Sequence, residues 1–317
     1  MKLNTKGVLI GLGVSAVLVA ILVARMDWAE FRAAFDDVRW SWVALGCAGV
    51  LTTITIRAMR WAVLSEAQAR QLGVYWNATV VGYVGNVLYP GRAGEVLRIA
   101  ALHHALRLPP GELVAKAFVD RMADVVLLGV AAFYVLGVLA TQVARDAPLG
   151  WLAALLVVPV AGFVGLLAVG AHMMPLVRSV ASFLPARWGE RIPRWYGQLL
   201  EACGELARPG RLARAMGFTL VAYCVDYAIL WLFLAAFEWT LPLQAAMTVG
   251  VLLAIGSMLP AAPGYIGIYQ VACVLALRPY GIGESAALAY SVVAQGATLL
   301  VIGVLGAVVA MRYGLRL

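Results

Sequence analysis

The sequence predicts an all-α polytopic membrane protein with about six full transmembrane helices plus two re-entrant helical hairpins in an inverted repeat. Of its 317 residues, 63% are hydrophobic and 13% are charged, whereas soluble domains have about 45–50% apolar and about 25% charged residues. Several apolar runs approach the length that a helix needs to cross a bilayer. Alternating strand patterns of the kind found in membrane β-barrels are absent from the sequence.

The predicted crossings follow one another along a single integral membrane domain, 1–317, with repeat halves at approximately 1–150 and 151–317. We place the six full crossings at about 7–24, 42–56, 113–140, 151–170, 216–237 and 284–311. The first crossing is longer than the apolar core of a usual signal peptide, and no clear cleavage pattern follows it. We therefore expect a retained anchor.

Two stretches between the crossings have the pattern of helices that lie on a membrane surface. Residues 27–40 combine apolar positions at helical spacing with mixed charge, which is typical of a surface helix. Residues 175–214 form a long basic connection in which Trp195 and Leu199 mark one apolar face. Arginines beside such a face favour an interfacial helix attracted to anionic lipid headgroups.

Two further apolar segments are shorter than the roughly 20 residues needed to cross hydrocarbon. Residues 75–89 run into PGRAG (Pro90–Gly94), and residues 243–259 run into PGYIG (Pro263–Gly267). Because each break is followed by a second short apolar helix, we expect two hairpins that each enter and leave on one side. Paired, interrupted segments at corresponding positions of two halves indicate a transporter site.

The charges of the loops predict the orientation, because cytoplasmic loops carry an excess of Lys and Arg. With a cytoplasmic N-terminus, the inner loops carry Lys2, Lys6, Arg57, Arg60, Arg70, Arg107, Arg178, Arg187, Arg191, Arg194, Arg208, Arg211, Arg214, Arg312 and Arg316, and the outer loops carry Arg25, Arg32, Arg39, Arg145 and Arg278. An odd number of full crossings separates the hairpins, so they enter from opposite faces. We expect a protein of the cell inner (cytoplasmic) membrane with both termini in the cytoplasm.

The candidate site consists of polar groups at the two breaks and of charges at membrane depth. Its residues are Asn86, Pro90, Gly91, Arg92, Gly94, Glu95, Arg98, Lys116, Asp120, Arg121, Asp124, Asp226, Pro263, Gly264, Tyr265, Gly267, Tyr269 and Gln270. A charge in hydrocarbon costs several kcal/mol, so it persists where it is paired or lines a wet cavity. A structural ion-pair cluster is the alternative for the charges, and a tight turn without ligand contact is the alternative for the glycines.

The charged residues around the first break have helical spacing. Arg92, Glu95 and Arg98 share one face of the hairpin's second helix, and Lys116, Asp120 and Asp124 share one face of the next crossing. We expect these two faces to meet. The helix after Pro90 offers unpaired N–H groups, and the planar guanidinium of Arg92 fits phosphate oxygens, so we predict that Arg92→Ala abolishes transport.

Motifs of other functional classes are absent from the sequence. It has no HExxH, GxSxG or ATP-binding loop, and it has no CxxC. The pair His103–His104 lacks the partners of a zinc site. We therefore expect no catalytic residues, no metal, no cofactor and no nucleic-acid partner, and an intramembrane enzyme acting on a lipid is a further alternative.

Three motifs, in this order, resemble the transmembrane flippase-like family of lysylphosphatidylglycerol synthases. They are NVLYPGRAGEVLR (86–98), VDRMADVVLL (119–128) and MLPAAPGYIGIYQ (258–270). The resemblance implies a membrane protein that moves lipids between leaflets. As a stand-alone member without the aminoacyltransferase domain, it should not synthesise the aminoacyl lipid. Asp120 stands where this family pattern has Glu, and Gln270 stands where an acidic residue is common.

The function expected from these observations is a flippase or scramblase-like lipid transporter. It would move a phospholipid or a related lipid headgroup between leaflets through a charged cavity at the midplane. The alternative is a secondary transporter of a small anionic solute or of a proton-coupled solute. The expected partners are the lipid substrate and the anionic membrane surface, and homo-oligomerisation stays open.

Overall fold

The computed structural model describes residues 5–89, 93–142, 169–206, 209–258 and 262–312, and every regular element in them is a helix. In chain order these are α1 (Thr5–Arg25), α2 (Trp28–Ala33), α3 (Trp40–Leu64), η1 (Ala69–Gln71), α4 (Leu72–Leu88), α5 (Gly94–Leu106), α6 (Pro110–Gln142), η2 (Gly170–Met173), α8 (Met174–Ser182), α9 (Ala186–Gly189), α10 (Arg191–Leu206), α11 (Pro209–Ala236), α12 (Leu243–Gly256), η3 (Pro263–Tyr265), α13 (Ile268–Leu277), η4 (Arg278–Tyr280) and α14 (Glu284–Arg312). Pro90, Gly91, Arg92 and most of the predicted crossing at 151–170 lie outside the described residues.

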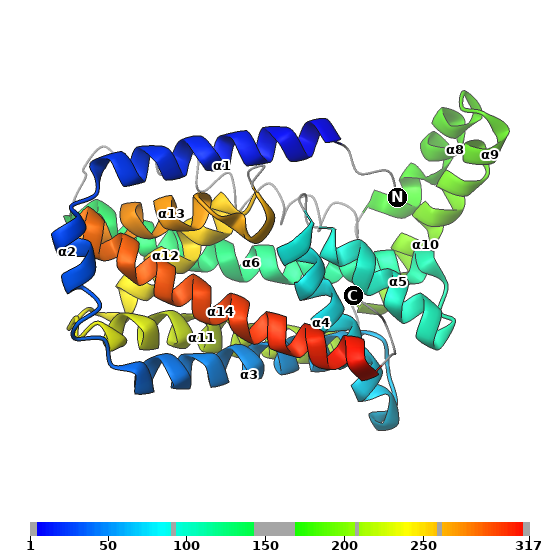
Figure 1. Cartoon of the computed structure of the whole chain (residues 1–317). Coiled ribbons are helices and arrows are strands. Elements are labelled where there is room, and N and C mark those ends of the chain that lie inside the picture. Colours follow the sequence, from blue (N-terminus) through cyan, green and yellow to red (C-terminus); the bar gives the residue numbers. More distant parts are fainter. Residues whose placement is uncertain (1–4, 90–92, 143–168, 207–208, 259–261, 313–317) are drawn as a thin grey trace.

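The long helices run roughly along one axis of an elongated bundle (Figure 1). α3 packs along α11, and α14 contacts both α3 and α4. The side chains of Ile54, Phe233 and Tyr290 are fully buried between these helices. Among the described helices, three are long and apolar enough to cross a membrane, and they are α3, α11 and α14.

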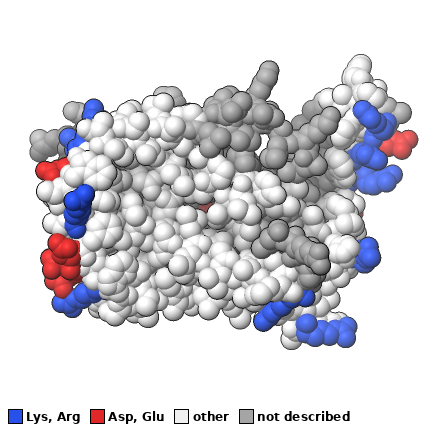
Figure 2. All heavy atoms as spheres, in the orientation of Figure 1, with Lys and Arg blue, Asp and Glu red and all other residues white. Residues whose placement is uncertain are grey.

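The surface of the bundle is divided into charged ends and an uncharged belt. On the face that Figure 2 shows, Lys, Arg, Asp and Glu gather at the two ends of the long axis. Large apolar side chains remain exposed along the helices, among them Leu45, Val130, Phe133, Leu300 and Val304. An exposed apolar belt between charged ends is the surface that a bilayer covers.

Two pairs of short helices stand in the bundle at the positions where the sequence is interrupted. The joined ends of α4 and α5 and the joined ends of α12 and α13 both lie toward the middle of the long axis, and the two pairs come from opposite ends (Figure 1). α4 and α5 pack closely because a Cβ on Gly85 would lie 2.9 Å from the Cα of Gly94. The second break, η3, packs against α4.

The structure corrects two helix boundaries. α3 continues past the expected end at Ile56, so Arg57 and Arg60 lie inside a helix and not in a cytoplasmic loop. α11 begins earlier than predicted, so Arg211 also belongs to a helix and pairs with Glu66. The predicted boundaries are wrong because a charge inside a membrane protein does not end a helix when its side chain finds a partner.

Surface helices were expected at two places. The first, at 27–40, contains the short helix α2, whose N-terminus is capped by Asp27, because its Oδ1 accepts the N–H of Ala29 at 2.8 Å. The second, at 175–214, is divided into α8, α9 and α10, after which α11 begins. These three helices lie at one end of the bundle, beside the start of α6 (Figure 1).

Candidate functional site

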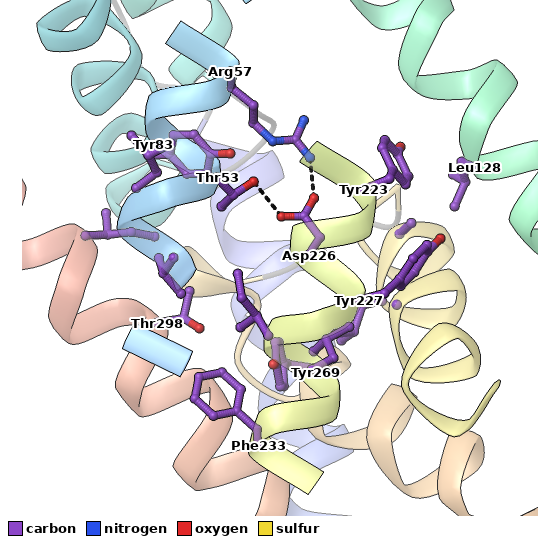
Figure 3. Close-up of a pocket in the computed structure, with 18 residues that line it drawn as sticks. Thr53, Arg57, Tyr83, Leu128, Tyr223, Asp226, Tyr227, Phe233, Tyr269 and Thr298 are labelled. Carbon is purple, nitrogen blue, oxygen red and sulfur yellow. Dashed lines mark hydrogen bonds and ion pairs between the residues drawn. The ribbon is translucent and has the colours of Figure 1, made fainter. Parts of the chain in front are cut away.

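A cavity of about 300 Å³ lies between α3, α4, α6, α11, α12, α13 and α14 (Figure 3). Its polar lining consists of Thr53, Arg57, Tyr83, Tyr223, Asp226, Tyr227, Tyr269 and Thr298, and its other lining residues are apolar or glycine. Each interrupted helix pair contributes one tyrosine, Tyr83 from α4 and Tyr269 from α13. The cavity is thus the place where both pairs reach the same space.

The wall of the cavity carries an ion pair between α3 and α11. The guanidinium of Arg57 donates from Nη2 to Oδ2 of Asp226 at 2.5 Å, and the hydroxyl of Thr53 donates to Oδ1 at 2.7 Å. The Asp226 side chain is 29% exposed and that of Arg57 is 16% exposed. The ring of Tyr223 lies beside the pair, 5.8 Å from the guanidinium carbon of Arg57. Both charges are therefore compensated while a part of each still faces the cavity.

Behind this pair is a second, more deeply buried group of charges. Arg60 lies 2.6 Å from Oδ1 of Asp120 and donates to Oδ1 of Asp124 at 2.7 Å, and the Arg60 and Asp120 side chains are almost fully buried. The indole N–H of Trp61 donates to Oδ2 of Asp120 at 2.9 Å. Asp124 also lies 3.6 Å from Nη1 of Arg57. Asp124 is therefore shared by two arginines of α3, besides its contact with Arg121 on its own helix, and connects the cavity wall to α6.

The charged faces of α5 and α6 meet beside this group. Glu95 on α5 pairs with Arg121 on α6, and it also accepts from Nη2 of Arg98 at 2.5 Å. The guanidinium of Arg98 stacks over Trp61, 4.5 Å from the ring centroid. Lys116 does not join this contact and pairs instead with Glu112, one turn earlier on α6.

The second break is held by neutral amides. Gly264, Tyr265 and Gly267 have positive φ angles of 72°, 60° and 89°. The Oε1 of Gln270 accepts the N–H of Gly267 at 2.7 Å, the amide of Gln270 donates to Gln295 at 2.6 Å, and the amide of Gln295 donates to the carbonyl of Gly264 at 2.7 Å. Gln295 therefore joins α14 to α13 through Gln270, and its bond to Gly264 closes the turn.

A family model, that of the lysylphosphatidylglycerol synthase TM region, matches residues 8–306. The chain belongs to this family. No curated protein and no solved structure matches it. Membership confirms the resemblance found from the three motifs, and together with the apolar helices it makes the chain a multi-pass membrane protein connected with membrane lipids.

The first and third family motifs lie at the two helix breaks. Asn86 accepts the N–H of Gly94 at 3.0 Å through Oδ1 and so connects the two helices of the first pair. Pro263, Gly264 and Tyr265 form η3, and Gly264 is buried. Of the predicted site residues, the described ones that line the cavity are Asp226 and Tyr269.

Sequence reasoning missed the two arginines that hold this site together. The sequence predicts a loop at Arg57 and Arg60, yet these arginines pair with Asp226, Asp124 and Asp120. The signal was the run AMRWAVL after Arg57, which continues the helical pattern of α3. Within the described residues, no group of three or more His, Cys, Asp and Glu is arranged to hold a metal ion.

Proposed function

We propose that this protein moves a membrane lipid between leaflets, with the polar headgroup passing through the cavity beside Arg57 and Asp226. The observation that carries the proposal is an ion pair on the wall of a cavity between apolar helices, touched by both interrupted helix pairs. Charges inside a membrane protein are typical of a substrate pathway. The acyl chains would remain in the surrounding lipid.

The ion pair offers a means of receiving a phosphate. A phosphate in this space needs a compensating positive charge, and the guanidinium of Arg57 has the planar donors that fit phosphate oxygens. Without a substrate, Asp226 and Asp124 compensate Arg57. The hydroxyl of Tyr227 is buried and has no hydrogen-bond partner within the described residues, so it is available to a headgroup oxygen.

The proposed architecture has about six crossings and two re-entrant hairpins in an inverted repeat. The protein would lie in the cell inner membrane, with both termini in the cytoplasm. The opposite directions of the α4–α5 and α12–α13 pairs support it (Figure 1). In transporters with such repeats, substrate sites lie near the midplane where the repeats meet. Transport would then be a rocking of one half against the other around the cavity.

The test is reconstitution into liposomes that contain fluorescent phospholipids with several headgroups. We expect lipid movement well above that of empty vesicles. Asp226→Asn and Arg57→Gln should each slow it about tenfold or more, because a hydrogen bond to a charged group is worth about 1.5–3 kcal/mol. The matched control is Asp37→Asn, which removes an exposed carboxylate from the α2–α3 connection. Rates equal to those of empty vesicles for every headgroup would overturn the proposal.

The cavity volume also supports a second candidate, a transporter of a small anionic or proton-coupled solute. About 300 Å³ is at the lower end of the range of roughly 300–1,000 Å³ for small-molecule sites. The same liposomes distinguish the two candidates. Uptake of a labelled solute without any movement of lipid would favour the second.

A further inference from the structure

A basic and apolar surface lies outside the proposed lipid pathway, at the tip of the arm formed by α8, α9 and the first five residues of α10. We call residues 174–195 the arm tip. Its exposed large apolar side chains are those of Leu176, Val180, Phe183, Leu184, Trp188 and Trp195. The Phe183 side chain is 87% exposed. So many neighbouring apolar groups on one short segment indicate a surface that is covered by something else.

The arm tip is also strongly basic. Arg178, Arg187, Arg191 and Arg194 are all exposed, and Glu190 is the single acidic residue in the range 174–195. Arg191 and Arg194 stand in the first turns of α10. Positive charges destabilise that end of a helix, because the helix dipole is already positive there. The two arginines therefore do not stabilise α10. Anions outside the protein would compensate their positive charges.

The aromatic residues of the arm tip are arranged as at a membrane interface. The rings of Trp188 and Trp195 pack edge to face with centroids 6.2 Å apart, and the guanidinium carbon of Arg187 lies 6.0 Å from the Trp188 ring centroid. Tryptophan with neighbouring arginine is enriched where hydrocarbon meets headgroups. Lys and Arg atoms gather at this end of the molecule (Figure 2).

We propose that the arm tip docks on the anionic lipid headgroups of the leaflet at this end of the bundle. Its apolar side chains would enter the boundary of the acyl chains, and its arginines would lie among the lipid phosphates. The occupant is an anionic leaflet and not a protein, because the charge is complementary and the arm begins at the end of a membrane-embedded bundle. This inference does not depend on what the cavity transports.

Docking of the arm tip would restrict the movement of α6, the helix that carries much of the charged site. α10 packs against α6, and the side-chain amide of Gln198 lies against Gly111. Gly111 stands at the start of α6, the helix of Asp120 and Asp124. An arm held on the membrane surface would therefore fix the position of this end of α6.

Hydrogen exchange of the full-length protein in nanodiscs tests the docking without any transport assay. One set of nanodiscs holds only zwitterionic phosphatidylcholine, and the other holds 30% phosphatidylglycerol as well. We expect the amides of α8 and α9 to exchange about tenfold more slowly with phosphatidylglycerol, because each arginine near an anionic surface contributes a severalfold preference. High salt should reduce this difference, because exposed charges are screened.

The decisive variant carries Arg187→Gln, Arg191→Gln and Arg194→Gln and should lose the difference between the two lipids. The matched control carries Arg25→Gln, Arg32→Gln and Arg278→Gln, which are exposed arginines outside the arm, and it should keep the difference. Phe183→Ser should raise exchange in both lipids by removing the apolar contact. Equal exchange of the unsubstituted protein in both lipids overturns the proposal, as does an unchanged difference in the arm variant.

Discussion

The two interrupted helix pairs have matching Pro-Gly breaks but opposite chemistry. Beside the first, charges on α5, α6 and α3 form a continuous set of ion pairs through Glu95, Arg121, Asp124 and Arg60. At the second, the chain turns on neutral amides, and Gln270 and Gln295 satisfy the backbone of the turn itself. Both pairs nevertheless reach the same cavity.

The charged groups beside the first break can exchange partners, whereas the neutral amides at the second break hold one fixed conformation. Asp124 is shared by Arg57, Arg60 and Arg121, so its partners can be redistributed when a charged group arrives. The amide chain at the second break has each donor matched to a single acceptor. We therefore interpret the ion pairs carried by α3, α5, α6 and α11, which we call the ionic side, as the responsive part of the cavity, and the second break as its scaffold.

The largest effect should come from the buried centre of the ionic side. Arg60→Gln leaves Asp120 and Asp124 without their main partner, and breaking a buried ion pair from one side costs about 3–5 kcal/mol. We expect a loss of that size in the free energy of unfolding, measured by denaturation in detergent. Arg70→Gln, at an exposed arginine, should change it little. A loss no larger than that of Arg70→Gln would show that the Arg60 ion pairs do not stabilise the fold.

The scaffold side should be sensitive to its central amide. Gln295→Leu leaves the Gln270 amide and the Gly264 carbonyl unpaired, and each unsatisfied group costs about 1–3 kcal/mol. We expect a total loss of about 2–4 kcal/mol in the free energy of unfolding, since part of the structure relaxes. Gln244→Leu, which removes only a 3.2 Å bond to Tyr134, is the control. Similar stabilities for the two variants would contradict the claim that the Gln295 hydrogen bonds stabilise the second break.

The backbone conformation of the second break can be tested by adding one methyl group at Gly267. Gly267 has φ 89°, and a Cβ there would lie 3.0 Å from the carbonyl oxygen of Ser15 on α1. Gly267→Ala should therefore cost about 1–3 kcal/mol through backbone strain. Gly296→Ala, where a Cβ meets no neighbouring atom, should be neutral or slightly stabilising, because alanine favours helix over glycine. Thermal unfolding of both variants decides between strain and a general intolerance of added volume.

The smallest effect is expected at the outer edge of the ionic side. The Arg121 side chain is 40% exposed, so Arg121→Gln should change the free energy of unfolding by no more than about 1 kcal/mol, as for surface ion pairs. Arg39→Gln, which breaks the exposed pair with Glu238, serves as the reference. A loss as large as that of Arg60→Gln would mean that the whole ionic side is one buried unit.

Much of the architecture could be predicted because it depends on local composition and spacing. The apolar runs indicated helices, and the proline and glycine pairs marked both breaks. The charged faces of α5 and α6 could be predicted to meet because the helices are neighbours in the chain and each face has helical spacing. The motif order was enough to find the family.

The site around Asp226 could not be predicted in the same way. Its partner Arg57 is 169 positions away in the sequence, and helical spacing says which face a residue occupies but not which helix that face contacts. The same limitation hid the pairing of Arg60 with Asp120, because an arginine without a known partner suggested a loop.

The sequence by itself determined that the chain is helical, that it is interrupted twice and that it carries the motifs of its family, since these follow from residues close together in the chain. Only the tertiary structure decided that Arg57 and Arg60 lie inside α3 and that Tyr83 and Tyr269 line one cavity. The physical reason is that a charge or a hydroxyl inside a membrane protein is tolerated according to the partner it meets. That partner is set by the packing of distant helices.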